Sequence, residues 1–475
     1  MTIDSSWIAT FKEEAPEAFT KLPPFQPKAV FCDGQIRLMR GNSQGLLTWD
    51  DYIWQQFQAH IAKFYRNHGV STVILAFDDY AHVPEAKCMT QLKRRRHIPK
   101  LEILAREPLP PVCPCGARWE QSIANRVFKA KVIARVIEVL PGLLNLRQGQ
   151  SLIIDYAGAP IEHTPSADGT LISRKLEHLC PLGEADIKFP RYAEIYRDLL
   201  VDSVDGDSIP IALVHTETAF RDLTMGTMRT EDLTSSPPRI SIYRITTRVD
   251  TDEEPSQSTG KRKKPADSAS TGASTTPHPS QPKRAKRTFE YVSIPALFSA
   301  LRTVVAQCLG RAGCPSHNQH YISMLVSLIG LTGTDFSRQL PQVSGKTLFN
   351  LLPDLIASLL ISYDPSEGQL NIYQATDRLV AGIYAVKFRT HVTNRPSQSS
   401  LKTILATLRA SKLSERTRSF LPTNEQILCT VRNVNWILRY WRNPTLTPTP
   451  TELNPDGIAT YGFVRRNGLV GYADL

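Results

Sequence analysis

Short apolar runs alternate with longer amphipathic segments in the first half of the chain. Residues 29–33 and 70–77 are nearly continuous apolar runs, which predict buried strands. Between them, residues 46–68 carry large apolar side chains near helical spacing, which predicts a helix. The same patterns predict a helix over 120–139 and strands over 152–156 and 199–204. This order of elements predicts an α/β fold with a mainly parallel central sheet flanked by helices.

Residues 250–288 interrupt the pattern, because they are rich in Ser, Thr, Pro, Lys and Arg and nearly free of large apolar residues. Such a segment cannot bury enough surface to fold alone, so we expect a disordered insertion. The net charge of the chain is +11, and Lys261–Lys264 and Lys283–Arg287 supply eight basic residues. Two basic blocks around a Ser/Thr/Pro spacer are typical of a nuclear-import signal over 261–287. The prediction is a nuclear protein that binds an import receptor, with a cytoplasmic protein and a nonspecific electrostatic tether as alternatives.

Apolar helical segments resume at 294–309 and 320–331. A tight turn at Gly345-Lys346 then enters another helix, where backbone amides and the lysine could hold a phosphate. The region 395–475 is expected to be a helix with a Pro-rich extension, and its aromatic stripe is more typical of a core than of a base-stacking surface. No run of about 18 apolar residues occurs, so no membrane partner is expected.

Seven acidic residues lie at the ends of apolar segments, where solvated carboxylates have little reason to gather. In an extended chain, side chains at i and i+2 point to the same side, so Glu184/Asp186 and Asp205/Asp207 each present two carboxylates together. Ligands of parallel sheets gather at the carboxyl ends of strands. Because like charges at short range repel, the set predicts a site for divalent cations. The seven residues are Asp33, Asp78, Glu184, Asp186, Asp205, Asp207 and Asp335.

In order, spacing and local context these acids resemble those of the flap endonuclease/XPG superfamily of 5′ nucleases, which has a PIN-like catalytic domain. The likeness covers about residues 28–355 outside the insertion. Lys87 and Arg94 also keep the seven-residue spacing of two basic residues that meet the 5′ phosphate in the family. The resemblance therefore implies catalytic phosphate contacts from Lys87 and Arg94. Arg95 and Arg96 are expected to guide the nucleic-acid strand, with a solvated charge run as the alternative.

The sequence departs from the family pattern at several positions. Asp186 replaces the usual Glu, Asp79 offers a competing register for Asp78, and Gln342 stands where a hairpin Gly is common. Gly345 and Lys346 are the remaining residues implied to bind nucleic acid there. The sequence around Glu184 more closely resembles that of 5′→3′ exoribonucleases, which are built on the same catalytic domain.

The resemblance also implies an organisation of the chain. The first part of a nuclease domain is expected over 1–249, with an arch at about 80–140. The rest of that domain is expected over 289–394, with a helical hairpin (helix-hairpin-helix-like) at about 335–355. The insertion 250–288 and a C-terminal region 395–475 complete the chain. The lengthened stretch between Asp207 and Asp335 indicates a divergent member, and a viral origin is one interpretation.

Three classes of function follow. The first is a structure-specific DNA nuclease of replication, recombination or repair that acts at 5′ flaps or 5′ ends through two Mg²⁺ or Mn²⁺ ions. The second is an RNA nuclease of the same fold, acting as a 5′→3′ exoribonuclease or an endoribonuclease. The third is a catalytically inactive nucleic-acid-binding adaptor. Nothing in the sequence specifies an oligomeric state.

Overall fold

The structure of the protein is a computed structural model in which part of the chain is described. The described residues are 5–40, 48–79, 108–179, 183–203, 205–224, 237–248, 286–311, 321–332, 343–350, 363–364, 369–370, 424–442, 463–466 and 469–472.

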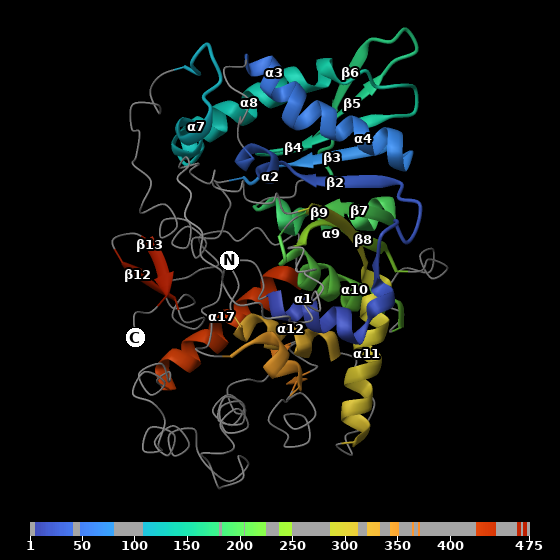
Figure 1. The fold of residues 1–475 in the computed structure, drawn as a ribbon, viewed down its shortest axis with the longest axis vertical. Coiled ribbons are helices and arrows are strands. Elements are labelled where there is room, and N and C mark those ends of the chain that lie inside the picture. Colours follow the sequence, from blue (N-terminus) through green and yellow to red (C-terminus); the bar gives the residue numbers. More distant parts are fainter. Residues whose placement is uncertain are drawn as a thin grey trace, which may run out of the picture.

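A sheet of nine strands forms the centre of the molecule, in the order β1-β9-β8-β7-β2-β3-β4-β5-β6 (Figure 1). The strands are β1 (Phe19–Thr20), β2 (Ala29–Asp33), β3 (Thr72–Ala76), β4 (Ser151–Asp155), β5 (Ile161–Pro165), β6 (Leu171–Lys175), β7 (Asp198–Asp202), β8 (Arg239–Arg248) and β9 (Lys286–Ser293). Two further pairs, β10 (Tyr363–Asp364) with β11 (Gln369–Leu370) and β12 (Phe463–Arg466) with β13 (Leu469–Tyr472), are separate antiparallel hairpins.

The sheet is mixed, which corrects the expectation of a mainly parallel one. Its five middle strands, β8-β7-β2-β3-β4, pair in parallel, while β5, β6, β9 and β1 add antiparallel pairings at the two sides. The apolar runs predicted four of the parallel strands, but β5–β6 and β8–β9 depend on pairing between polar or distant segments. The α/β class holds, and the parallel part is confined to the middle.

The parallel strands are doubly wound. In chain order they are β2, β3, β4, β7 and β8, so the chain moves outward from β2 to β4 and then returns to the other side of β2. The winding therefore changes direction between β2 and β7. In open α/β sheets, ligands bind beyond the carboxyl ends of the strands at such a switch point.

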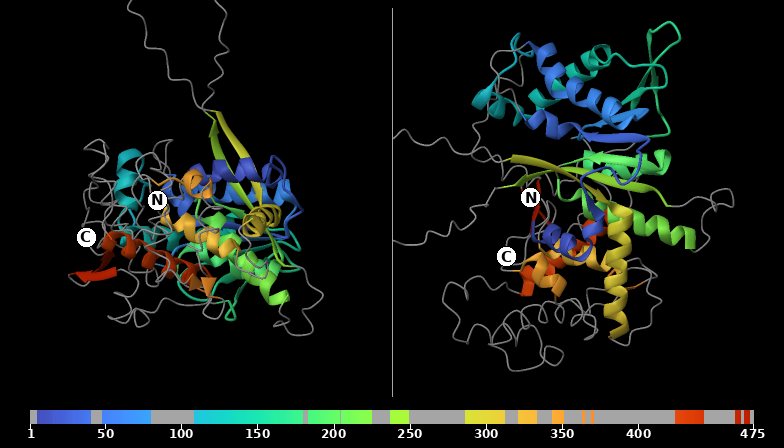
Figure 2. Two further views of the ribbon diagram at one scale, coloured as in Figure 1. Left: turned by 90° about the horizontal axis from the view of Figure 1, so that it is seen from below. Right: turned by 45° about the vertical axis from the view of Figure 1, so that its right-hand side comes forward.

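Helices cover both faces of the sheet, giving three layers (Figures 1 and 2). One face carries α2 (Gly34–Met39), α3 (Trp49–Ile53), the π-helical turn η2 (Trp54–Gln58), α4 (Ala59–His68), α7 (Gly116–Ile123) and α8 (Arg126–Leu143). The other carries α1 (Ser5–Glu14), η1 (Pro16–Ala18), α9 (Ala185–Tyr196), α10 (Ser208–Thr224), α11 (Ile294–Arg311), α12 (Tyr321–Leu331) and α17 (Asn424–Arg442). We call these the α4 face and the α9 face. No described helix has the length and apolar character needed to cross a membrane.

Strand alternation divides the apolar residues between two cores. Along β2, Ala29 and Phe31 belong to the core of the α9 face, whereas Val30 and Cys32 belong to the core of the α4 face. Asp33 continues the first set and is only 7% exposed at the strand end. Two neighbouring residues at the end of a strand can therefore serve different faces of the molecule.

The C-terminal helix α17 is part of the main core. It packs on α12 and α10, and Trp436, Tyr440 and Trp441 are buried in the core of the α9 face. These residues form the aromatic stripe predicted for the C-terminal region, so its core interpretation is confirmed. The helix also brings Tyr440 to the edge of the sheet described below.

Most of the predicted insertion lies between β8 and β9, which pair from Ser241 to Arg248 and from Lys286 to Ser293 as a long hairpin (Figure 2). Residues 286–288, its last three, belong to β9. The rest of the predicted insertion, with most of the import signal, lies outside the described residues.

Candidate metal and nucleic-acid site

Asp78, just after β3, accepts a hydrogen bond from the start of α9. Its Oδ1 accepts a hydrogen bond from the backbone N–H of Ala185 at 3.0 Å. The next residue, Asp79, donates its N–H to the carbonyl of Gly183 at 2.8 Å. Helix α9 therefore begins against the carboxyl end of β3, where an acceptor at a helix N-terminus is favoured. This contact brings Asp78 close to the Glu184/Asp186 pair.

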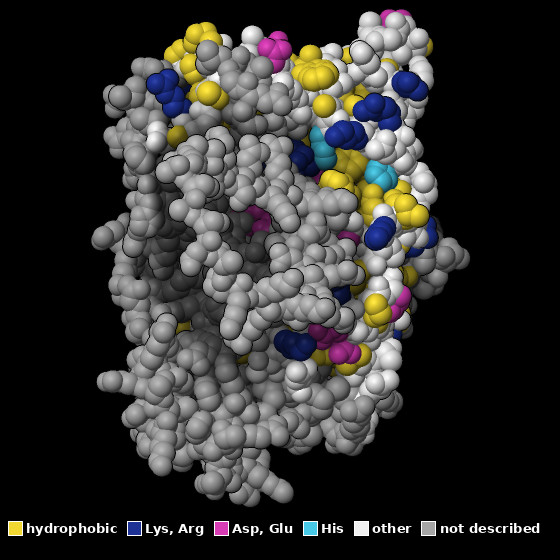
Figure 3. Space-filling view, viewed as in Figure 1, with side chains coloured by type: hydrophobic (Ala, Val, Ile, Leu, Met, Phe, Trp, Pro, Cys, Tyr) yellow, Lys and Arg dark blue, Asp and Glu magenta, His cyan; other side chains and the backbone are white. Residues whose placement is uncertain are grey.

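Glu184 and Asp186 lie at that helix start, with Glu184 at the N-cap position and 1% exposed. Tyr440 of α17 lies beside them. Burial, and then the negative charges of Glu184, Asp78 and Asp186, raise the pKa of Tyr440 well above its ordinary value, so the phenol stays protonated. Three predicted carboxylates thus act on one buried side chain, which places them in one neighbourhood. Figure 3 shows acidic side chains near the middle of this side of the molecule.

The other described carboxylates of the predicted set lie at the ends of the two strands that flank the switch point. Asp33 ends β2 and caps α2, accepting the N–H of Gln35 at 2.8 Å. Asp205 and Asp207 follow β7, and Asp205 Oδ1 accepts the N–H of Asp207 at 3.2 Å. Both pairs predicted from i, i+2 spacing are thus in turns or helix starts rather than in extended strands. Their positions at the carboxyl edge nevertheless agree with the expectation.

Asp155 is an acid that the sequence analysis missed. It ends β4, is fully buried, and accepts hydrogen bonds from Lys188 Nζ and Tyr192 Oη, both at 2.8 Å. Lys188 also donates to the carbonyl of Phe77 at 2.9 Å. Burial raises the pKa of Asp155 and outweighs the opposing charge of Lys188. Its place near the end of the predicted strand 152–156 was a readable signal for Asp155, whereas its partners are 33 and 37 residues away in sequence.

A second hydrogen-bond network, centred on Asp202, lies on the α4 face of the same carboxyl edge. Asp202, the last residue of β7, receives Arg37 Nη2 at 2.8 Å and lies 2.6 Å from His60 Nε2. Burial opposes ionisation of Asp202, but the hydrogen bond from His60 and the charge of Arg37 lower its pKa to about 2. Burial lowers the pKa of His60 by more than Asp202 raises it, so His60 is neutral at pH 7 and Nε2–H donates.

The geometry can be tested against metal binding in both places. Among the described residues, three potential ligand atoms come within 4.8 Å of one another only in Cys32, His60 and Asp202. Arg37 already occupies the same Asp202 oxygen, and burial raises the pKa of the Cys32 thiol, so this trio fits a hydrogen-bond network better than a cation. The Asp78, Glu184 and Asp186 carboxylates do not bring three ligand atoms that close together. A cation that keeps several of its waters needs fewer direct carboxylate ligands.

No protein-family model matches the chain, and no curated protein is detectably similar to it in sequence. The site therefore rests on its own residues.

Other predicted site residues lie outside the described part of the chain: Lys87, Arg94, Arg95, Arg96 and Asp335. Gly345 and Lys346 are described, and both contact α1. The N–H of Gly345 donates to Ser6 Oγ at 2.9 Å, and Lys346 Nζ lies 2.9 Å from a carboxylate oxygen of Glu13. A phosphate at this turn would have to displace both contacts.

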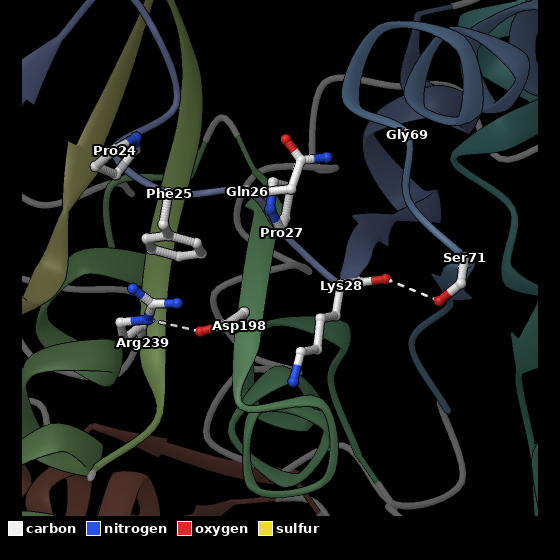
Figure 4. A pocket seen from close by; sticks show the side chains of 9 residues that line it. All are labelled: Pro24, Phe25, Gln26, Pro27, Lys28, Gly69, Ser71, Asp198 and Arg239. Atoms are coloured by element: carbon white, nitrogen blue, oxygen red, sulfur yellow. Dashed lines mark hydrogen bonds and ion pairs between the residues drawn. The ribbon is translucent and has the colours of Figure 1, made fainter.

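The opposite, amino-terminal edge of the parallel strands has a pocket of about 630 Å³ (Figure 4). It is lined by residues at or just before the strand starts, including Lys28, Asp198 and Arg239. Arg239 Nε donates to Asp198 at 2.7 Å, and its guanidinium lies 5.0 Å from the ring of Phe25. The charges of Arg239 and Asp198 are thus paired with each other. The acidic carboxyl edge is the stronger candidate for chemistry.

Proposed function

We propose that the protein is a metal-dependent nuclease that hydrolyses phosphodiester bonds at the carboxyl edge of its parallel strands. The observation that carries this proposal is the approach of Asp78 to Glu184 and Asp186 at the start of α9. Asp33 and the Asp205/Asp207 pair add carboxylates at the neighbouring switch point. The likeness to 5′ nucleases supports a PIN-like domain and DNA with free 5′ ends as the substrate class.

The carboxylates and Tyr440 have different roles in this proposal. Asp78, Glu184 and Asp186 would hold the cations directly or through water, with Asp205 and Asp207 contributing from the turn after β7. Two bound Mg²⁺ or Mn²⁺ ions would supply an activated water and stabilise the oxygen that leaves phosphorus. Tyr440, as a neutral phenol, can donate a hydrogen bond to a carboxylate or a phosphate oxygen. The burial of Glu184 and Tyr440 limits water around these charges and strengthens their interactions.

The test compares cleavage of 5′-flap DNA, single-stranded DNA and 5′-phosphorylated RNA in Mg²⁺ or Mn²⁺. Asp205→Ala/Asp207→Ala is expected to lower cleavage more than about a hundredfold, because it removes two carboxylates from the cation site. Asp198→Asn is the matched control, since Asp198 lies at the opposite end of the same strand, β7. This control should retain cleavage of whichever substrate the native chain cuts.

Each outcome identifies a different function. Cleavage of flap DNA that only the double variant loses supports the DNA nuclease. Cleavage of RNA alone, again lost only in the double variant, identifies the RNA nuclease. The exoribonuclease-like sequence around Glu184 favours this alternative. A folded native chain that cuts none of the substrates contradicts the proposal and supports the inactive adaptor.

A further inference from the structure

The β8–β9 hairpin extends beyond the carboxyl edge of the sheet. Tyr243 of β8 is paired with Asp202, the last residue of β7, and β8 continues to Arg248. Five more residues of β8 therefore project past the ends of the neighbouring strand, a distance of roughly 16 Å. The projection leaves from the same edge as the candidate metal site. Figure 2 shows the two strands reaching beyond the helices.

Aromatic side chains lie along this hairpin on the α4 face. Phe289 and Tyr243 are stacked, with ring centroids 5.4 Å apart and planes 7° from parallel. Tyr243 also lies 5.1 Å from Tyr291 and meets Phe64 of α4 edge-on at 6.4 Å. Phe289 is 50% exposed, so the outer ring of the stack faces solvent. A single exposed phenylalanine is common, but one presented flat on a second ring forms a surface for further stacking.

Charges of both signs lie around the stack. Asp202 acts to raise the pKa of Tyr243, while the positive charges of Arg37 and Arg40 act to lower it. Arg37 is paired with Asp202, and Arg40 is exposed at the end of α2. The outer end of the hairpin is basic in sequence, since Arg248 is paired with Lys286. Figure 3 shows hydrophobic, histidine and basic side chains together on this part of the surface. A flat aromatic surface with an arginine nearby is complementary to an unpaired base and its phosphate.

We propose that the α4 face of the β8–β9 hairpin binds single-stranded nucleic acid, with a base stacked on Phe289 and a phosphate near Arg40. The choice of ligand rests on the proposed nuclease function. A strand held on this projection leaves the protein at the carboxyl edge, where the candidate metal site lies. The hairpin would therefore guide the single-stranded part of a substrate.

The experiment measures binding of fluorescein-labelled oligo(dT) and oligo(rU) to the full chain by fluorescence anisotropy in EDTA, so that binding is separated from cleavage. Phe289→Ala is expected to weaken binding about tenfold, since stacking of one base contributes on this scale. Phe289→Trp should bind the oligonucleotides as the native chain does, because tryptophan can also stack on a base. Trp54→Ala is the matched control, because Trp54 is an aromatic residue of 52% exposure elsewhere on the α4 face, and it should bind as the native chain does.

The charge component has its own variant. Arg40→Gln should reduce the dependence of affinity on salt by about one released ion while leaving the stacking contribution in place. Equal affinity in the native chain and in Phe289→Ala would overturn the inference. Failure of the native chain to bind either oligonucleotide would overturn it as well.

Failure of the inference and failure of the nuclease function are distinguishable. A native chain that binds through Phe289 but cuts no substrate contradicts only the nuclease function. A native chain that cuts, and whose binding is unchanged in Phe289→Ala, contradicts only the inference. If Phe289→Ala changes the sedimentation of the protein and not its oligonucleotide affinity, the aromatic surface is a protein interface instead.

Discussion

The two faces of the sheet use acidic residues differently at the same carboxyl edge. On the α4 face, Asp202 is matched by the guanidinium of Arg37 and the imidazole of His60. On the α9 face, Asp78 accepts from a backbone amide, and the Glu184 and Asp186 carboxylates lie around the neutral phenol of Tyr440. The first arrangement stabilises an ionised carboxylate within the protein. The second brings three carboxylates around one buried phenol, and it is the arrangement for which we propose a cation.

Asp155 shows that this contrast follows the partner and not the face. It lies on the α9 side, yet Lys188 and Tyr192 bind both of its oxygens. We therefore group Asp155 with Asp202 as structural carboxylates, and Asp78, Glu184 and Asp186 as candidate metal ligands. The two groups should differ in how substitution and added metal change stability.

The largest effect on stability is expected from Lys188→Met. It leaves the fully buried Asp155 without its ammonium partner, and loss of one member of a buried pair costs about 3–5 kcal/mol. Urea unfolding measures this change. The double variant Asp155→Leu/Lys188→Met should recover part of the lost stability, because Asp155→Leu removes the uncompensated carboxylate. A loss below about 1 kcal/mol in Lys188→Met would remove Asp155 from the structural group.

Asp202→Asn should produce the next largest effect and a change in pH dependence. Because the folded pKa of Asp202 is about 2 and its unfolded value is about 3.9, the ionised carboxylate contributes roughly 2.6 kcal/mol above pH 5. This contribution is lost as the pH falls toward 2. The native chain and Asp202→Asn should therefore differ most at pH 7 and converge in acid, as followed by urea unfolding. Asp50→Asn, at an exposed position, controls for loss of a carboxylate, and parallel curves for the native chain and Asp202→Asn would contradict the assignment.

Mg²⁺ should distinguish the two groups directly. At about ten times its dissociation constant, a cation that binds only the folded chain adds about 1.4 kcal/mol to the free energy of unfolding. Thermal unfolding with and without Mg²⁺ measures this increment. We expect it in the native chain and in Asp202→Asn. We expect its loss in Asp205→Ala/Asp207→Ala, which removes two further carboxylates of the proposed cation site. An increment that follows Asp202 would place the cation on the wrong face.

Asp78→Asn is expected to change stability least, by less than about 1 kcal/mol. An asparagine oxygen can still accept from Ala185, and the substitution removes repulsion with Glu184 and Asp186. Cleavage should nevertheless fall sharply if Asp78 holds a cation. Paired measurements of urea unfolding and cleavage decide the matter, and a destabilisation as large as that of Asp202→Asn would make Asp78 a structural residue.

The sequence predicted the parts of the fold that depend on local pattern. Continuous apolar runs located β2, β3, β4 and β7, and helical spacing located α11 and α12. The predicted helix over 120–139 divides, because Asn125 caps a new helix through its side chain. Strands β5, β6, β8 and β9 were not predicted, since their stability comes from partners and not from an apolar run.

The candidate site was predictable to a similar extent. Position at a strand end was enough to suggest Asp33, Asp78, Asp205 and Asp207, all of which lie at the carboxyl edge. Which acids are matched by protein cations was not predictable, because Lys188 is distant in sequence from Asp155 and Arg37 from Asp202. Tyr440 was missed for the same reason.

The hairpin has a consequence for how this chain can vary. Because β8 and β9 are paired up to Arg248 and Lys286, the segment between them leaves and re-enters the fold at adjacent points, about 5 Å apart. The entropy of closing such a loop rises only with the logarithm of its length, by about 0.6 kcal/mol for each doubling. Lineages can therefore lengthen, shorten or replace this segment without rebuilding the sheet. The end of the hairpin is therefore a position where added sequence carries little thermodynamic penalty.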